Sequence, residues 1–390
     1  MQPLLEEISK IYKPAEISAN SGGSSYGITS VLSNKKNIGS VSKIPSTDVA
    51  GLPGDTNPPS SAVTWQTDAI KTVTIGKDSI GIVYKDTSDI TINENNIAYF
   101  YLAFCGYNKI YLNQLDSSLS STKYLAPFAR SGGSNESGTA EAFLNDNNLG
   151  GNGSKSYLKT MSATNSTLVE TANEDDSIYE ILSKGSYGSL TQSTNETSLE
   201  TWEAIKNYSS KDKSGVAITY LSSGFIKNNY AEITNSGFKV ANYSLENVEL
   251  ITNNNGQYDI NNSYNWFRPL NLVMKTKNVQ GVIESKYLVQ WILGTILFEK
   301  SKLNSIYKEL GFITITKEQI KTMFDPNDTS LIDRISNFAS TYPDKTYKDF
   351  LTSNPDATWD SFWISDYDLY TAQKTIRDQS KEYYGAILRG

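Results

Sequence analysis

The 390-residue sequence has no histidine and a single cysteine, Cys105. Without histidine the chain lacks the commonest general base, the commonest zinc ligand and every Ser–His or Cys–His nucleophile. Cys105 ends the apolar run that begins at Ile97 and has no cysteine to pair with, so we expect a buried, inert thiol. We therefore predict that the protein is not an enzyme and holds no metal or other cofactor.

The remaining enzyme-like motifs are weak. Ser33–Lys36 fits the Ser-x-x-Lys pattern of penicillin-recognising enzymes, but the same pattern recurs at Ser120–Lys123 and Ser156–Lys159. The Ser-x-Asn triplet that should follow Ser33 precedes it instead, at residues 18–20. Gly76–Lys77 lacks the earlier glycine of a nucleotide-binding P-loop.

Long apolar runs and excess positive charge are also missing. No stretch of about 18 apolar residues is present, so we expect no membrane-spanning segment. The net charge of -7 and the pI of about 5.0 argue against nucleic acid as a partner. Hydrophobic residues make up 38% and charged residues 20%, which is typical of a folded protein.

Met1 leads directly into a helical pattern, so either the protein is cytoplasmic or an export segment has been removed.

The most informative feature that is present is the segment from Arg130 to Thr139. It joins a guanidinium to Ser137-Gly138-Thr139, just before the helix-forming residues 140–144. Arginine offers a planar fork of donors, and backbone amides at a helix start favour an anion. Ser-Gly-Thr before a helix is often only an N-terminal cap, which is the alternative interpretation. With Arg130 beside it, we interpret the segment as a site that holds phosphate without transforming it.

Alternating helical and extended patterns predict an α/β fold with ligand loops at the carboxyl ends of strands. The apolar run at 79–84 is typical of a buried parallel strand. We expect helices at 3–13 and 286–300 and strands at 16–20, 37–42, 79–84, 215–221 and 266–273.

Several segments, taken in order, resemble the phosphate-binding proteins of bacterial ABC importers, the PstS family. Their order and spacing along residues 1 to about 315 carry the resemblance, because each segment alone is unspecific. The matching segments are Ser21–Gly27, Ile38–Ser42, Ile80–Val83, Arg130 with Ser137–Thr139, Tyr264, Arg268–Leu270 and Gly311–Ile313.

The resemblance implies a two-lobed, periplasmic-binding-protein-like (class II) α/β fold with a hinge between the lobes. It places lobe 1 at residues 1–85 and 265–315 and lobe 2 at 86–264. Residues 316–390 would form a helical C-terminal extension packed on lobe 1. The aromatic residues of that extension are expected to pack in a core, as is common for such side chains.

The resemblance also implies six phosphate ligands. Ser24 and Ser42 would contribute from the first lobe, and Arg130, Ser137, Gly138 and Thr139 from the second. Two departures affect this site. An insertion separates Arg130 from Ser137, and Ser42 stands where several family members have an aspartate that accepts the phosphate proton. A serine there would discriminate less well against sulfate. We expect Arg268 to form a structural salt bridge rather than to bind the ligand.

The family begins with a strand and a loop before the first helix, whereas this chain starts at that helix. We therefore expect a misassigned or trimmed start, and weaker phosphate binding than in a form with the upstream segment restored. Equal affinities of the two forms in calorimetry would contradict this.

The leading functional hypothesis is an extracellular solute-binding protein that captures inorganic phosphate and delivers it to an ABC transporter permease. Its place would be the outer face of the cell membrane, with a lipid anchor in the full-length protein. One alternative is a binding protein for another oxyanion such as sulfate. Another is a surface adhesion or scaffold protein in which the aromatic C-terminal extension forms the interaction surface.

Overall fold

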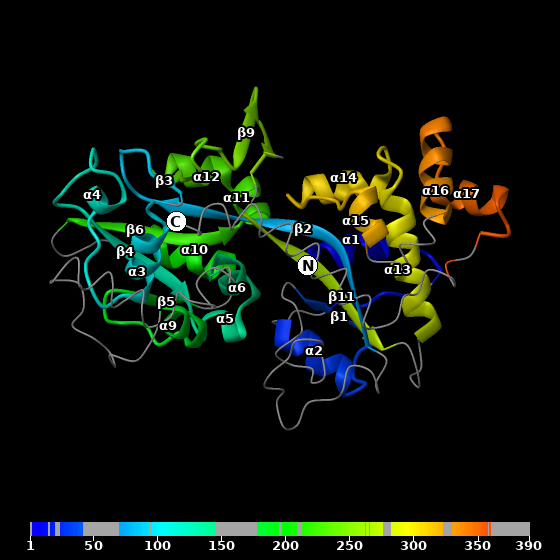
Figure 1. The fold of residues 1–390 in the computed structure, drawn as a ribbon, viewed down its shortest axis with the longest axis horizontal. Coiled ribbons are helices and arrows are strands. Elements are labelled where there is room, and N and C mark those ends of the chain that lie inside the picture. The colour runs from blue at the N-terminus through cyan, green and yellow to red at the C-terminus, as the bar shows by residue number, and fades with distance from the viewer. Residues whose placement is uncertain are drawn as a thin grey trace. The chain divides into compact units, whose positions relative to one another are not determined.

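The computed structural model of the protein consists of two compact units (Figure 1). Among the described residues, unit 1 combines those up to Lys77 with those from Pro269 to 359, and unit 2 runs from Asp78 to Arg268. Two strands, β2 (Ile70–Tyr84) and β11 (Phe267–Lys275), carry the chain from one unit to the other. The predicted α/β class with two lobes is confirmed. The structure describes residues 2–14, 16–19, 24–41, 70–93, 95–144, 178–194, 197–208, 213–261, 263–264, 266–275, 282–322, 330–357 and 359.

Unit 1 pairs a small sheet with helices from both ends of the chain. Its strands follow the order β1–β11–β2, and β1 (Ile38–Val41) runs antiparallel to β11, with Ile38 opposite Met274. The helices are α1 (Gln2–Ile11), α2 (Ser24–Leu32), α13 (Val282–Ile296), α14 (Lys302–Glu309), α15 (Lys317–Thr322), α16 (Ser330–Thr341) and α17 (Tyr347–Ser353).

The core of unit 1 is mainly aliphatic and is supplied by its helices and by strands β2 and β11. Leu4 and Ile8 lie one helical turn apart on α1, so a single face of this helix is buried. The same core includes Ile332 of α16 and Phe350 of α17, and α17 packs against α13 and α16. Residues beyond 316 therefore contribute to the interior of unit 1, and removing them would expose apolar surface.

Unit 2 is built on a sheet with the order β2–β6–β4–β5, to which β7 adds by pairing with β2. Strand β6 is antiparallel to β2 and parallel to β4, which is parallel to β5. All residues of β4 are buried, so both faces of the sheet are covered there. The strands are β3 (Thr91–Ile92), β4 (Tyr124–Arg130), β5 (Gln192–Thr194), β6 (Gly215–Ser222), β7 (Lys239–Val240), β8 (Asn242–Tyr243), β9 (Ile251–Asn254) and β10 (Gln257–Ile260).

Helices of unit 2 pack on this sheet, and α3, α6, α10 and α11 contact its central strands β4 or β6. No helix in the described parts of the chain is long and apolar enough to cross a membrane. The helices are α3 (Ile97–Cys105), α4 (Leu112–Leu115), α5 (Gly133–Glu136), α6 (Gly138–Leu144), α9 (Ile178–Lys184), α10 (Ser198–Lys206), α11 (Ser223–Asn228) and α12 (Tyr230–Asn235).

The structure corrects two of the expected elements. Residues 16–19 form no strand, and among the described residues they pair with no neighbouring strand. The buried run at 79–84 belongs to β2 as a strand, but β2 is antiparallel to β6, not parallel. A continuous apolar run reports burial on both faces, and it does not report strand direction. Cys105 is buried as expected, at the end of α3, and burial raises the pKa of its thiol.

Candidate functional site

Strand β4 ends at Arg130, whose backbone is held by two tyrosine hydroxyls. The Arg130 amide donates to the Tyr220 oxygen over 2.9 Å, and the Tyr187 hydroxyl donates to the Arg130 carbonyl over 2.8 Å. Burial raises the pKa of Tyr220 to about 12, so this hydroxyl stays protonated at neutral pH. Side chains from β6 and from the segment after α9 thus fix the place at which β4 stops.

The Arg130 side chain is 1% exposed and faces the start of α10. Its Nη1 donates to the Thr197 carbonyl over 2.6 Å and to the Thr201 hydroxyl, and its Nη2 lies 3.3 Å from the Ser198 hydroxyl. All of these acceptors are neutral oxygens. They orient the guanidinium and satisfy part of its hydrogen-bonding capacity, as a buried charge requires.

The insertion between Arg130 and Ser137 forms the one-turn helix α5. Gly133 begins this helix with a φ of 58°, and a β-carbon there would lie 2.1 Å from the Leu182 carbonyl oxygen. Only glycine fits such a close approach to the end of α9. At the other end of the turn, the Ser137 amide donates to the Gly133 carbonyl over 3.0 Å. The insertion is therefore a packed turn that leads directly into the predicted anion loop.

Ser137 is 3% exposed and precedes α6, which begins at Gly138. The Ser137 hydroxyl accepts a hydrogen bond from the Ala140 amide over 3.3 Å, as a helix cap does. The capping interpretation of this serine is thus confirmed. A hydroxyl that accepts in this way still has its own hydrogen to donate, so capping is compatible with a ligand role.

Thr139 is half-buried and contacts a residue that is distant in the sequence. Arg268 Nη1 donates to the Thr139 hydroxyl oxygen over 3.0 Å. The same guanidinium forms the expected salt bridge, with Nη2 and Nε lying 2.8 and 3.1 Å from one Asp78 carboxylate oxygen. Asp78 and the contact with Thr139 were missed by sequence reasoning. A charged residue directly before the apolar run at 79–84 was the available signal for Asp78.

The two ligands predicted in the first lobe, Ser24 and Ser42, lie partly or wholly outside the described residues. Ser24 is the first residue of α2, but its side chain lies outside what the structure describes, and so does the whole of Ser42. Their roles as phosphate ligands stay predictions. The structure brings Ser137, Gly138 and Thr139 together at the start of α6 and places Arg130 at the end of the preceding strand.

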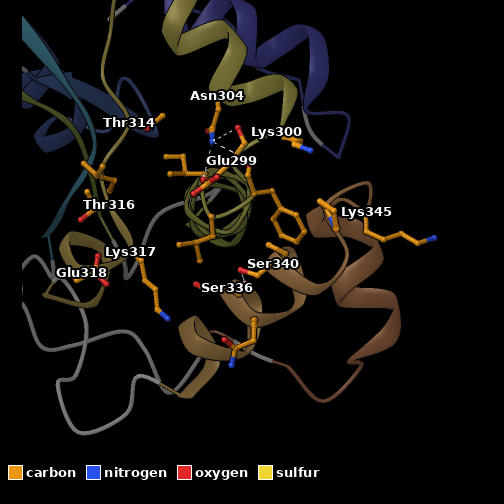
Figure 2. A pocket seen from close by; sticks show the side chains of 17 residues that line it. Glu299, Lys300, Asn304, Thr314, Thr316, Lys317, Glu318, Ser336, Ser340 and Lys345 are labelled. Carbon is orange, nitrogen blue, oxygen red and sulfur yellow. Dashed lines mark hydrogen bonds between the residues drawn. The ribbon is translucent and has the colours of Figure 1, made fainter. Parts of the chain in front are cut away.

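Unit 1 contains a cavity of about 770 Å³ that none of the predicted ligands lines. Figure 2 shows its side chains, which come from the end of α13, from α14 and from the segments around α15 and α16. Three lysines and two glutamates carry its charge, so neither sign dominates strongly. These residues are Glu299, Lys300, Lys317, Glu318 and Lys345.

Three solved structures of phosphate-binding proteins are similar to the chain. The high affinity periplasmic phosphate-binding protein PfluDING has a TM-score of 0.49 at 14% identity, over 83% of this chain and 92% of that one. A phosphate-binding protein from Stenotrophomonas maltophilia gives 0.47 at 14%, over 80% and 89%. A putative phosphate ABC transporter substrate-binding protein from Clostridium perfringens gives 0.46 at 16%, over 81% and 96%.

The sequence itself has a relative that is matched over nearly its full length. No model of a known protein family matches the chain. The uncharacterized lipoprotein MG412 of Mycoplasma genitalium is 31% identical over 375 residues, which cover 91% of this chain and 89% of the relative. The chain therefore belongs to the family of this mycoplasma lipoprotein.

Proposed function

We propose that the protein is a solute-binding protein that binds inorganic phosphate. The observation that carries this proposal is the hydrogen-bonding state of the loop Ser137–Thr139. Both hydroxyl oxygens already accept a hydrogen bond, from the Ala140 amide and from Arg268 respectively. Each hydroxyl keeps its hydrogen to donate, and the ionised oxygens of an oxyanion are acceptors that need such donors.

Arg130 adds positive charge at the end of the strand that precedes this loop. Binding requires that protein donors replace the hydration shell of the anion, which is favourable only where those donors are already oriented. The two tyrosines that hold the Arg130 backbone, and the oxygens at the start of α10 that hold its guanidinium, fix this arginine in place. Arg130, Ser137, Gly138 and Thr139 are the ligands that we propose in unit 2, and Ser24 and Ser42 stay the ligands predicted from the sequence of the first lobe.

Sulfate is a second candidate ligand because of Ser42. An aspartate at this position would accept the proton of hydrogen phosphate and repel the fully ionised sulfate, whereas a serine does not repel it. A competition titration of phosphate against sulfate decides between them. Phosphate displaced by equimolar sulfate would assign the site to oxyanions in general.

The setting we propose is the outer face of the cell membrane. The relative in Mycoplasma genitalium is named a lipoprotein, and three solved structures similar in fold are phosphate-binding or phosphate-transport proteins by name. In this role the protein would be anchored by a lipid, would not catalyse a reaction, and would pass phosphate to an ABC transporter permease.

Thermal melting with and without millimolar phosphate tests the function. A ligand at 100 times its Kd stabilises the folded protein by about 2.7 kcal/mol, so the melting temperature should rise. Arg130→Ala should weaken phosphate binding by about 2–5 kcal/mol in calorimetry, because a desolvated partner of the anion is lost. Arg334→Ala, which removes an exposed arginine of α16, is the matched control. Unchanged affinity in Arg130→Ala would remove Arg130 from the site.

A further inference from the structure

We propose that Arg268, held by Asp78, is a positioning residue that sets the Thr139 hydroxyl as a donor to the bound anion. This inference rests on the proposed oxyanion site and adds two residues to it that the phosphate-ligand prediction did not contain. The chain of contacts runs from Asp78 on β2, through Arg268 on β11, to Thr139 on α6.

Asp78 is a fixed anchor for the guanidinium. Its side chain is 2% exposed, and its Oδ1 accepts from the hydroxyls of Ser222 and Ser223 over 3.3 and 3.0 Å. Its Oδ2 accepts from both Nε and Nη2 of Arg268. A carboxylate with donors on both oxygens has little freedom to rotate. Because Nε and Nη2 form one edge of the guanidinium and both bind Asp78, the carboxylate fixes the orientation of the guanidinium plane.

The remaining edge of Arg268 decides how Thr139 hydrogen-bonds. A guanidinium carries only donors, so in the contact between Nη1 and the Thr139 oxygen the threonine must be the acceptor. The Thr139 hydrogen then points away from Arg268. Thr139 and Arg268 are both half-buried, whereas Asp78 is enclosed, so a ligand at Thr139 does not meet the carboxylate.

The pairing also keeps the carboxylate of Asp78 compatible with an anion nearby. With Arg268 in place, the pair carries no net charge. Without Arg268, an uncompensated buried carboxylate would repel the ligand, and burying such a charge is itself unfavourable. The loss caused by Arg268→Gln should therefore be partly reversed by a second change, Asp78→Asn.

Phosphate calorimetry on Thr139 and Arg268 variants tests the proposal. Thr139→Val should weaken binding about 10- to 100-fold, because a hydrogen bond to a charged ligand is lost, whereas Thr139→Ser should stay close to the wild type. Arg268→Gln should also weaken binding, and the part of its loss that Asp78→Asn does not reverse should largely disappear when Thr139 is already valine. If Arg268 had a purely structural role, Arg268→Gln would instead lower the melting temperature. Its fold-loss of phosphate affinity would then multiply with the fold-loss caused by Thr139→Val.

The outcomes separate this inference from the proposed function. A wild type that binds neither phosphate nor sulfate overturns both. A wild type that binds phosphate while Arg268→Gln keeps full affinity, or while the two losses multiply, overturns the positioning role alone. If Arg268→Gln does not fold, Asp78→Asn/Arg268→Gln replaces it in the cycle, because this variant removes both buried charges together. The same criterion of non-additivity with Thr139→Val then applies.

Discussion

The core of unit 2 is linked to the proposed ligand residues, whereas the core of unit 1 has no such link among the described residues. In unit 2, Phe143 of α6 lies at the centre of an aromatic cluster, with ring centroids 4.1 Å from Tyr220 and 4.7 Å from Phe104. Tyr220 in turn accepts the hydrogen bond of the Arg130 amide, and α6 carries Thr139. In unit 1, the core is mainly aliphatic and joins the helices to one another and to strands β2 and β11. In unit 2, Tyr220 and helix α6 thus belong both to the core and to the candidate site. Changes in this core should therefore affect stability and binding together.

The largest expected effect comes from Phe143→Ala. Removing a fully buried phenylalanine should lower the free energy of unfolding by about 3–5 kcal/mol. Phosphate affinity should fall as well, because Tyr220 loses the ring stacked on it. Urea unfolding and calorimetry measure the two effects. The control is Phe338→Ala in α16, where a half-buried ring contacts Phe350 and Tyr342. It should cost less stability and leave phosphate affinity unchanged, and a loss of binding there would contradict the comparison.

A change of intermediate size is expected from Gly294→Ala in unit 1. In a helix interior, alanine is normally more stabilising than glycine by about 1 kcal/mol. In α13, however, a β-carbon at this position would lie 2.4 Å from the ring of Tyr347. We expect a net destabilisation of about 1–3 kcal/mol from overpacking, measured by thermal unfolding, with phosphate affinity unchanged.

A companion variant separates the two contributions at Gly294. Tyr347→Leu removes the ring that the new methyl group would meet. In that background Gly294→Ala should become much less destabilising, since the clash is relieved and the helix preference remains. An equal loss in both backgrounds would show that the close approach of α13 and α17 is not the cause.

The smallest effect should come from Asp333→Asn. Hydrogen bonds from Lys317 and Lys321, at 2.6 and 2.7 Å, hold the pKa of Asp333 at about 2, below its ordinary value of 3.8. A lowered folded-state pKa adds stability above pH 3.8, and this contribution is lost as the pH falls toward 2. Because the side chain is 39% exposed, we expect about 1 kcal/mol or less at pH 7.

Melting curves of wild type and Asp333→Asn from pH 7 down to pH 2 check this prediction. The two curves should converge at the acid end and, because salt screens exposed ion pairs, should also approach each other in about 1 M salt at pH 7. A gap that widens toward low pH would contradict the assigned ion pairs.

The sequence predicted local features better than the contacts that complete the candidate loop. Apolar patterning located parts of the strands β2, β6 and β11 and of the helix α13, because burial selects apolar residues in continuous runs or at regular spacing. The capping role of Ser137 followed from its place before a helix. The partner of Thr139 did not follow, since Arg268 is 129 residues away in the sequence and only the folded chain brings the two side chains together.

The insertion before Ser137 illustrates the same limit. Its length suggested a longer loop, and the structure shows the short helix α5 packed against the end of α9. The backbone conformation of Gly133 was not visible in the sequence, because glycine is common in flexible turns as well. Arg130 was recognised as an important residue, but its contacts with Thr197 and Thr201 depend on the arrangement of β4 and α10.

The passage of β2 and β11 between the units has a consequence for the order of folding. All of the described residues of unit 2 lie between Asp78 and Arg268, so its described part is complete once residue 268 has left the ribosome. Unit 1 cannot complete its fold at that point, since β1 pairs with β11 and helix α1 packs against α14, which are synthesised later. Its N-terminal apolar residues remain without partners until the last third of the chain is made, which predicts slow completion of unit 1. Nascent chains halted after residue 268 should therefore show a protease-resistant unit 2 and a cleavable N-terminal segment.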